Sequence, residues 1–136
     1  MPVKIDLCPL NDLNPKDPVT MLNLLRYKET TETVDNGEKI RCTGREAYGR
    51  YAAHTTTLAA ALPISIVYAG HAVAHLVASN DVPWDDMLIV QYPSVQSFID
   101  MISSDAYQRV VHLRNDALED SRLIAMQEGL QAAFDL

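Results

Sequence analysis

Basic residues and cysteines are scarce in this sequence. Its 136 residues include 11 Lys and Arg against 18 Asp and Glu, a formal net charge of −7, and the basic residues form no cluster. A protein that binds a phosphate backbone or an anionic membrane normally needs a basic face, so we expect neither nucleic acid nor membranes as partners. The two cysteines, Cys8 and Cys42, match neither a disulfide framework nor a metal-ligand spacing. Free thiols in a reducing cytoplasm are the better interpretation.

Long apolar runs and the common nucleotide and nucleophile motifs are also missing. Uncharged apolar stretches stay well short of the ~20 residues that span a bilayer, and Asp6, Asn11 and Asp12 interrupt any N-terminal secretion signal. We therefore expect a soluble, cytoplasmic protein. The sequence has no Gly-rich phosphate loop, no G-x-S-x-G elbow and no Cys–His nucleophile pair. These absences argue against nucleotide-dependent chemistry and acyl-enzyme hydrolysis.

The most informative stretch that is present covers residues 19–28, VTMLNLLRYK. Large apolar residues follow one another on both sides of the pleat, and Asn23 is the single polar interruption. A strand of this kind is buried on both faces and lies in the middle of a sheet. Residues 87–92, MLIVQY, have the same character. We expect these two runs to form the central strands.

Proline, glycine and apolar periodicity set the limits of the other elements. Four prolines in residues 1–18 predict an extended arm without helix, which either wraps a neighbouring subunit or crosses the protein's own surface. Residues 29–43 are polar and include Asn36-Gly37, a strong turn signal that suits a small hairpin. The remaining expected elements are a helix over 43–62, a strand over 64–78, a turn over 79–86, a helical region over 94–118 with a break at 103–104, a strand over 121–127 and a tail over 128–136.

The resulting order, β-α-β-β-α-β, is that of the ferredoxin-like fold. The sequence therefore predicts an α+β protein with one domain over residues 19–127, in which a four-stranded antiparallel sheet carries two helices on one face. The opposite face of the central strands is apolar too, and an open apolar face of that size is unusual on a monomer. A second copy of the chain is the simplest cover. We therefore expect a homodimer formed through the open sheet face.

Several segments resemble those of a known family. They are MLNLLRYK, GREAYGRYAAH, VYAGHAV, ALEDSRLIA and WDDMLIVQYPSVQSFIDMI, in which the YPS-x-x-x-F step is the most specific. Over residues 19–127 the chain resembles an uncharacterised, mainly bacterial family, a domain of unknown function, in the dimeric α+β barrel superfamily. The resemblance implies a ferredoxin-like protomer whose sheet packs on a partner's sheet. The superfamily includes cofactor-free monooxygenases, lactone isomerases, haem-dependent enzymes and ligand-sensing domains, so the shared fold does not fix an activity.

Asn23 is the first candidate for a functional residue. An amide buried without partners would cost about 1–3 kcal/mol, so its side chain must be hydrogen-bonded. Either it forms a structural hydrogen bond to a helix or a partner chain, or it orients a substrate carbonyl or stabilises an oxyanion. Tyr27, on the same strand face, Tyr92, near the end of the neighbouring strand, and Tyr48, on the buried helix face, are expected to line the same cleft. For tyrosines at strand ends, amphipathic packing is the alternative.

His54 and Trp84 are further candidates. His54 follows Tyr51 by three residues on the buried side of the predicted helix, where a neutral imidazole could act as a general base. A partly exposed helix histidine is the alternative. Trp84 either closes the mouth of a pocket over an apolar ligand or covers the edge of the core.

We expect no metal and no cofactor. His71 and His75 are four residues apart, but on a strand this spacing separates them by about 13 Å. No Asp, Glu or Cys completes a ligand set with them.

Two functions fit these residues. The first is a cofactor-independent oxygenase or isomerase acting on a small apolar ring compound, with Asn23 and Tyr92 positioning oxygen atoms and His54 moving the proton. The second is a non-catalytic dimeric module that binds a small molecule or a partner protein.

Overall fold

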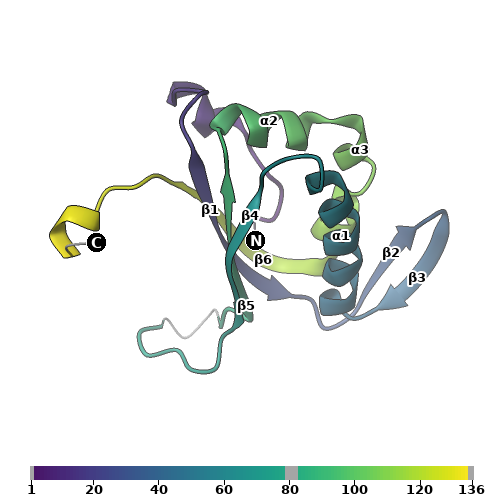
Figure 1. Cartoon of the computed structure of the whole chain (residues 1–136). Helices are drawn as coiled ribbons and strands as arrows, with labels where there is room; N and C mark the ends of the chain where they lie inside the picture. Colours follow the sequence, from purple (N-terminus) through teal and green to yellow (C-terminus); the bar gives the residue numbers. More distant parts are fainter. Residues whose placement is uncertain (1, 79–82, 135–136) are drawn as a thin grey trace.

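A four-stranded antiparallel sheet forms the centre of the protein. The computed structural model describes residues 2–78 and 83–134. The strand order is β4–β5–β1–β6, where β1 is Val19–Tyr27, β4 is Ser65–His71, β5 is Asp86–Tyr92 and β6 is Leu118–Met126. The two apolar runs predicted to be central are therefore β1 and β5, the two inner strands. Figure 1 shows the α-helices gathered on one side of this sheet.

The two faces of β1 differ in burial although both are mostly apolar. Val19, Met21, Asn23 and Leu25 are buried, and the residues between them are partly exposed. The buried side packs with β5, α2 and α3 in the main core, whose buried members are Leu10, Val19, Met21, Val90, Tyr92, Val95, Phe98, Ile102 and Tyr107. Among the described residues, no α-helix packs on the other side of the sheet (Figure 1). The α+β fold class and the four-stranded antiparallel sheet are thus confirmed.

Helix α1 (Gly44–Ala59) begins where a cap and a glycine are both available. The Thr43 hydroxyl accepts a hydrogen bond from the Glu46 amide at 3.1 Å, which satisfies one of the unpaired amides of the first turn. Gly44 lies so close to other backbones that an added Cβ would be 2.4 Å from the Ala117 carbonyl oxygen and 2.5 Å from that of Lys28. Only glycine fits there. The helix ends at Ala59 rather than at the predicted position 62, in a turn that leads to Pro63.

The second helical region is broken, as predicted, at Ser104. It forms α2 (Val95–Ser103), α3 (Asp105–Gln108) and α4 (Val111–Ala117). Ser104 has an extended backbone, with φ −67° and ψ 149°, and its side chain caps α3 by accepting from the Tyr107 amide. Strand β6 starts at Leu118, three residues before the predicted start, because Leu118 already pairs with Tyr27 across a register shift.

Two sequence predictions of extended structure are wrong. The strand predicted over 64–78 ends at His71, because its partner strand β5 begins at Asp86, the residue paired with His71. The arm over 1–18 contains a short 3-10 helix, η1 (Cys8–Asp12), with a proline in its first turn, where a missing amide hydrogen costs nothing. The turn predicted over 79–86 lies partly outside the described residues.

The arm crosses the protein's own surface, one of the two expected alternatives. Leu10 is buried in the main core, the Val95 amide donates to the Asp17 carbonyl at 2.8 Å, and the Arg114 guanidinium donates to the Val3 carbonyl. Residues 2–18 are thus tied to the same body as α2 and α4.

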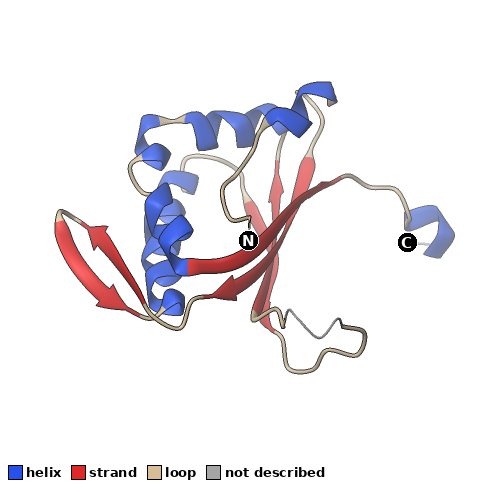
Figure 2. Ribbon diagram, turned by 180° about the vertical axis from the view of Figure 1, so that it is seen from behind, coloured by secondary structure: helices blue, strands red, loops and turns tan. Residues whose placement is uncertain are grey.

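A two-stranded hairpin forms in the polar segment, as its Asn-Gly turn suggested. Its strands are β2 (Thr31–Asp35) and β3 (Glu38–Cys42), and the turn residues Asn36 and Gly37 have φ of 52° and 77°. Figure 2 shows the hairpin projecting beside α1, while the C-terminal segment with η2 (Gln131–Phe134) extends away from the body. In the described part of the chain, no helix has the length and apolar content needed to cross a membrane.

Candidate functional site

A cavity of about 150 Å³ lies between α1 and the inner face of the sheet. Three of the predicted site residues line it together: Asn23 from β1, Tyr92 from β5 and Tyr48 from α1. The rest of the lining is mostly small or apolar, namely Tyr51, Ala52, Thr55, Thr56, Ala59, Ile64, Ile66, Leu88, Val90 and Met101. The cavity is therefore an apolar space with a few polar groups on its wall.

Asn23 has one structural hydrogen bond and one unused acceptor. Its Nδ2 donates to the backbone carbonyl of Leu88 on β5 at 3.2 Å, and the residue is only 9% exposed. No described residue donates a hydrogen bond to its Oδ1. The amide is thus held in place by the neighbouring strand, and its oxygen can still accept a hydrogen bond from a bound molecule.

The phenols of Tyr48 and Tyr92 are the other polar groups of this wall. Burial, followed by the nearby phenol of Tyr51, raises the pKa of both hydroxyls well above the ordinary tyrosine value. They are therefore neutral at physiological pH and able to donate a hydrogen bond. Tyr51 differs, because its hydroxyl lies 2.8 Å from that of Tyr107, where the two phenols form a hydrogen bond.

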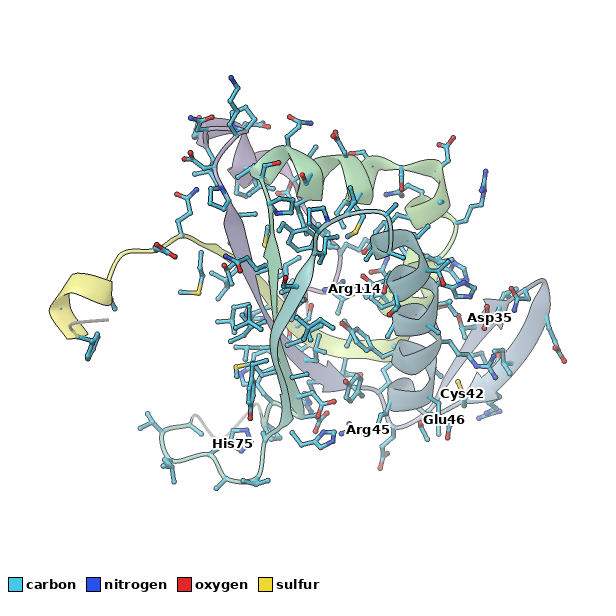
Figure 3. All side chains as sticks on the ribbon, in the orientation of Figure 1. Asp35, Cys42, Arg45, Glu46, His75 and Arg114 are labelled. Atoms are coloured by element: carbon cyan, nitrogen blue, oxygen red, sulfur yellow. The ribbon has the colours of Figure 1, made fainter. Side chains whose placement is uncertain are left out.

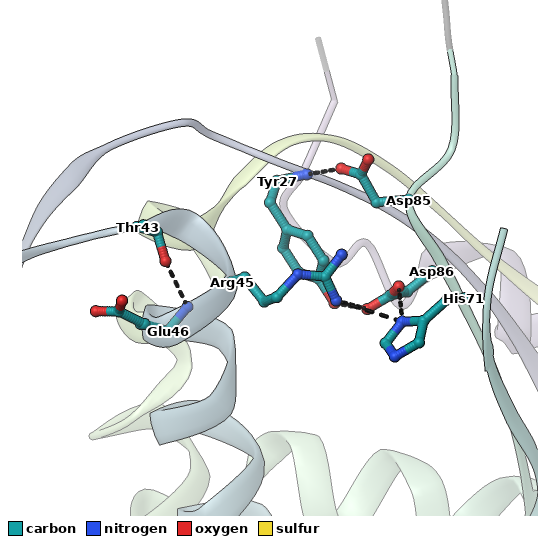
Figure 4. A network of polar contacts seen from close by, with 7 residues as sticks. All are labelled: Tyr27, Thr43, Arg45, Glu46, His71, Asp85 and Asp86. Atoms are coloured by element: carbon teal, nitrogen blue, oxygen red, sulfur yellow. Dashed lines mark hydrogen bonds and ion pairs between the residues drawn. The ribbon is translucent and has the colours of Figure 1, made fainter. Parts of the chain in front are cut away.

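Tyr27 lies at the end of the sheet in a separate polar network, shown in Figure 4. Its hydroxyl donates to Asp86 Oδ2 at 2.6 Å, and its backbone amide donates to Asp85 Oδ2 at 2.9 Å. Arg45, in the first turn of α1, donates to the same Asp86 oxygen at 2.8 Å and lies over the Tyr27 ring, 4.8 Å from its centre. Tyr27 contacts Tyr48 ring to ring at 5.7 Å but does not line the cavity.

The second oxygen of Asp86 holds His71. His71 Nδ1 lies 2.7 Å from Asp86 Oδ1. Burial opposes the charged form of Asp86, but hydrogen bonds from His71 and Tyr27 and the charge of Arg45 outweigh it, so the pKa of Asp86 lies below its ordinary value. Arg45 Nη1 also lies 3.4 Å from the same His71 nitrogen. Because the carboxylate is the nearer partner and, when ionised, can only accept, we assign the proton of the neutral imidazole to Nδ1.

His54 lies elsewhere, on the side of α1 that faces the hairpin. Its Nε2 lies 2.8 Å from Asp35 Oδ1, and Arg50 donates to Asp35 Oδ2 at 3.0 Å. The hydrogen bond from His54 leads the interactions that hold the pKa of Asp35 below its ordinary value. His54 does not line the cavity that contains Asn23.

Trp84 lines a second cavity, of about 260 Å³, together with His71 and His75. The guanidinium of Arg122 lies 5.4 Å from the centre of its ring, which is a cation–π distance. The backbone N and O of Trp84 both lie 3.1 Å from His75 Nε2. Figure 3 shows that Arg45 and His75 lie toward the same end of the sheet, while Asp35 lies in the hairpin.

Sequence reasoning missed Asp86, Arg45 and Asp35 as partners of functional side chains. It treated His71 only as one of a pair with His75 in a possible metal site. Cross-strand register brings His71 opposite Asp86, and a single sequence does not give this register. Within residues 2–78 and 83–134, no three His, Cys, Asp or Glu side chains come together as a metal site.

Known proteins share this architecture. A solved protein of unknown function from Rhodopseudomonas palustris is 29% identical to the chain; the match covers 93% of this chain and 96% of that one, with a TM-score of 0.81. A hydroxynitrile lyase from Passiflora edulis is 14% identical over 85% of this chain and 96% of that one, with a TM-score of 0.57. A dimeric protein of unknown function and ferredoxin-like fold from Bacteroides fragilis is 10% identical over 82% and 96%, with a TM-score of 0.50.

At these identities the last two likenesses show the fold alone, and it is ferredoxin-like. No curated protein matches the chain. The model of a protein family, the domain of unknown function DUF1330, matches residues 38–128, from β3 through the end of β6. This match covers α1, the candidate cavity's main helix, and three of the four strands of the sheet. The resemblance to an uncharacterised family is thereby confirmed, and the chain belongs to the DUF1330 family.

Proposed function

We propose that this protein is a cytoplasmic homodimer that binds a small, mostly apolar ring compound bearing a hydroxyl or carbonyl oxygen. The binding site is the cavity between α1 and the sheet. The observation that carries the proposal is that Asn23, Tyr48 and Tyr92, three residues with polar side-chain groups, line one small and mostly apolar space. No described residue forms a hydrogen bond with Asn23 Oδ1 or with the hydroxyl of Tyr48 or Tyr92.

The volume of the cavity limits the ligand to about one ring. An apolar cavity of about 150 Å³ engineered in another protein binds benzene, and this cavity has a volume of about 150 Å³. An oxygen substituent would match the polar wall, because neutral phenols donate to it and the Asn23 oxygen accepts from a hydroxyl. Ligand pockets typically combine an apolar lining with a few placed polar groups.

The dimer is supported by the helix-free face of the sheet. On that face Leu22 and Leu24 of β1 lie beside Ile89 and Met87 of β5, and Ile124 and Met126 of β6 are 45% and 48% exposed. An apolar face of this extent favours a protein partner, and a likeness in fold to a dimeric protein agrees with a second copy. The free thiols of Cys8 and Cys42 suit a reducing cytoplasm.

A second candidate is catalysis on the same ligand, as a cofactor-independent isomerase or oxygenase. The observation that favours it is the pair of neutral phenol donors, which could stabilise an enolate oxygen. The described lining of the cavity contains neither an imidazole nor a carboxylate, and His54, the expected base, is bound to Asp35. We therefore rank binding first.

Binding is tested by NMR titration of ¹⁵N-labelled protein with phenol, cyclohexanone and benzene. We expect phenol and cyclohexanone to shift the amides of the residues that line the cavity. Tyr92→Phe keeps the ring and removes only the hydroxyl, and the loss of one hydrogen bond should weaken phenol binding about fivefold to tenfold. Benzene binding should not change. Equal phenol affinity in the wild type and the variant, or shifts confined to other residues, would refute the proposed site.

The matched control is Tyr68→Phe, because Tyr68 is exposed and does not line this cavity. The dimer is tested separately by sedimentation equilibrium. A charge placed on the outer face by Leu22→Glu should convert the dimer to a monomer. A wild-type protein that sediments as a monomer would remove the dimer from the proposal without affecting the cavity.

A further inference from the structure

The second cavity lies on the helix-free face of the sheet. Leu24 and Met87, which are paired across β1 and β5, line it together with Trp84. The next pair along these strands, Asn23 and Leu88, lines the first cavity on the side of α1. Because successive side chains of a strand point to opposite faces of the sheet, the sheet separates the two cavities. The second cavity, of about 260 Å³, therefore belongs to the face through which the chain is proposed to dimerise.

Two aromatic rings and an arginine mark this second cavity. The Arg122 guanidinium lies 5.4 Å from the centre of the Trp84 ring, and Trp84 lines the cavity. Tyr68, which is 54% exposed, completes the aromatic part of the lining. Trp, Tyr and Arg are the residue types that most often dominate the binding energy of protein interfaces. This composition favours a protein segment as the occupant of the cavity.

The β4 loop, residues 72–78, forms the rim of the cavity. Its His75 lines the cavity, and His75 Nε2 lies 3.1 Å from both the backbone N and the backbone O of Trp84. Three apolar side chains of the loop are at least 94% exposed, namely Val73, Leu76 and Val77. Exposure of such side chains to water is unfavourable, and a contiguous apolar surface of this kind favours an apolar partner.

The C-terminal segment, residues 127–134, carries matching apolar side chains. Leu130 and Phe134 are each 68% exposed. Figures 1 and 2, which view the molecule from opposite sides, show this segment and the β4 loop extending from the sheet on the side away from the α-helices. The β4 loop, AVAHLVA, has no Asp, Glu, Lys or Arg, and the C-terminal segment, QEGLQAAF, has only Glu128. The two can therefore meet without like-charge repulsion, although each copy has a net charge of −7.

The C-terminal segment and the second cavity lie at opposite corners of the helix-free face. Strands β6 and β4 are the two edges of the sheet. The C-terminal segment follows Met126 of β6, which stands in one row of cross-strand pairs with Ser65, the first residue of β4. The cavity lies near the opposite end of β4, where Gly70 pairs with Met87. Within one copy, the segment and the cavity are therefore separated by both the width and the length of the sheet.

A second copy of the chain brings these two corners together. Two identical faces pack through a two-fold axis that lies between them, so that residue i contacts residue j and j contacts i. Four strands about 4.8 Å apart span about 14 Å, and Thr20 and Leu24, which belong to the two rows, are about 13 Å apart along β1. The face between the rows is therefore nearly square. A two-fold axis along the diagonal that joins its other two corners places each C-terminal segment over the partner's cavity. The strands of the two sheets then cross at nearly right angles, which is one of the two common arrangements of packed sheets.

We propose that the C-terminal segment of each copy docks on the partner copy, with Leu130 and Phe134 against the second cavity and the β4 loop. The inference rests on the homodimer of the proposed function and names the segments that hold it together. The occupant is a second copy, because the segment and its docking surface border the same face of one chain, and a single two-fold operation joins both segments to both surfaces. The apolar side chains that are most exposed in one copy are then buried in the dimer.

The first test is sedimentation equilibrium of the wild-type protein and of Phe134→Ser. Truncation of one well-packed interface residue commonly raises Kd about tenfold or more, and the dimer contains this contact twice, so we expect a rise of about 100-fold. Val34→Ser is the matched control, because Val34 is an apolar residue of the hairpin that is 45% exposed, and it should leave Kd unchanged. A wild-type dimer with the same Kd in Phe134→Ser would overturn the inference and leave the proposed dimer intact. A wild-type monomer would overturn both.

A double-mutant cycle identifies the surface that receives Phe134. Trp84→Ala removes a ring from the wall of the second cavity, and we expect it to raise Kd about tenfold or more. Because the two rings are in contact in the proposed dimer, the rise in Kd of the double variant should be smaller than the product of the two single rises. A rise equal to that product would place Phe134 elsewhere on the partner and overturn the docking site.

A further measurement needs no variant. Mixed dimers, refolded from ¹³C-labelled and unlabelled wild-type protein, allow isotope-filtered NOE spectra that record only contacts between copies. We expect NOEs between the Phe134 ring of one copy and the Leu24 methyl groups or the Trp84 ring of the other.

The same NOE contacts found within one copy would mean that the C-terminal segment folds back onto its own cavity, and this result would overturn the inference. A dimer in which Phe134 shows neither kind of contact would overturn it as well.

Discussion

The protein contains two clusters of the same three residue types, and they differ in what surrounds them. His71, Asp86 and Arg45 meet at the end of the sheet, and His54, Asp35 and Arg50 meet between α1 and the hairpin. In both, the carboxylate is mostly buried and binds the histidine and the arginine through different oxygens. The two histidines, however, are 75% and 33% exposed. The same three residue types thus form a largely exposed cluster at the end of the sheet and a less exposed cluster that links α1 to the hairpin.

The cluster around His54 attaches the hairpin to the body. The hairpin contacts α4 as well, where the Thr33 hydroxyl donates to Asp116 at 2.8 Å and His112 Nε2 lies 2.6 Å from the Val34 carbonyl. An isolated two-stranded hairpin is at best marginally stable in water. These side-chain contacts therefore attach β2 and β3 to the body. The cluster around His71 supports no comparable element, because β4 and β5 already belong to the main sheet.

The largest change in the free energy of unfolding is expected from a substitution that displaces α1. This helix carries Arg45, Arg50 and His54 and therefore links the two clusters. Gly44→Ala would place a methyl group 2.4 Å from the Ala117 carbonyl oxygen, and we expect the free energy of unfolding to fall by about 3 kcal/mol. Gly49→Ala is the matched control on the same helix, where an added Cβ meets no atom within 4 Å. It should stabilise the protein by up to about 1 kcal/mol. Urea denaturation measures both, and equal effects would contradict the close packing at Gly44.

A smaller effect separates the roles of the two carboxylates. Asp35→Ala and Asp86→Ala should each lower the free energy of unfolding by about 1–3 kcal/mol, since each leaves a histidine and an arginine without their acceptor. Hydrogen exchange should distinguish them. Asp35→Ala should accelerate amide exchange in β2 and β3, and Asp86→Ala should not.

Glu32→Ala is the control for this pair of variants. Its carboxylate lies 3.9 Å from Arg41 on the same hairpin, and both side chains are more than half exposed, so the expected change is below about 0.5 kcal/mol. If amide hydrogen exchange in β2 and β3 is the same in Asp35→Ala as in the wild type, Asp35 does not attach the hairpin to the body.

The smallest expected effect concerns how the stability of the protein changes at acidic pH. The pKa of Asp35 is held below its ordinary value of 3.8 in the folded protein, chiefly by the hydrogen bond from His54. A lowered folded pKa stabilises the protein above the unfolded pKa, and this contribution is lost as pH falls through about 4 and below. Asp35→Asn should therefore flatten the decline in stability on acidification. The urea midpoint measured from neutral pH to about pH 3 tests this, and identical slopes in wild type and variant would contradict it.

The sequence predicted that some of these residues lie beside one another, because strand alternation places them on the same face of the sheet. Asn23 and Tyr92 lie on adjacent central strands, and the apolar runs around them already identified both strands. Tyr48 follows from helical periodicity in the same way. Tyr27 lies on the same strand face as Asn23, as expected. It is four residues further along β1, however, and its hydroxyl binds Asp86 at the end of the sheet instead of lining the cavity. The predicted grouping of His54 with Asn23 depended on the rotation of α1, which periodicity gives only coarsely.

The sequence by itself determined the elements, the α+β class and the two central strands, because burial patterns and turn residues act locally. It also determined the Asn-Gly hairpin and the break at Ser104. The tertiary structure decided which charged residues meet. Asp86 reaches His71 through cross-strand register and Arg45 through the packing of α1, while Asp35 reaches His54 through the docking of a hairpin. Contacts between residues far apart in the chain depend on how whole elements pack, and no local pattern encodes that.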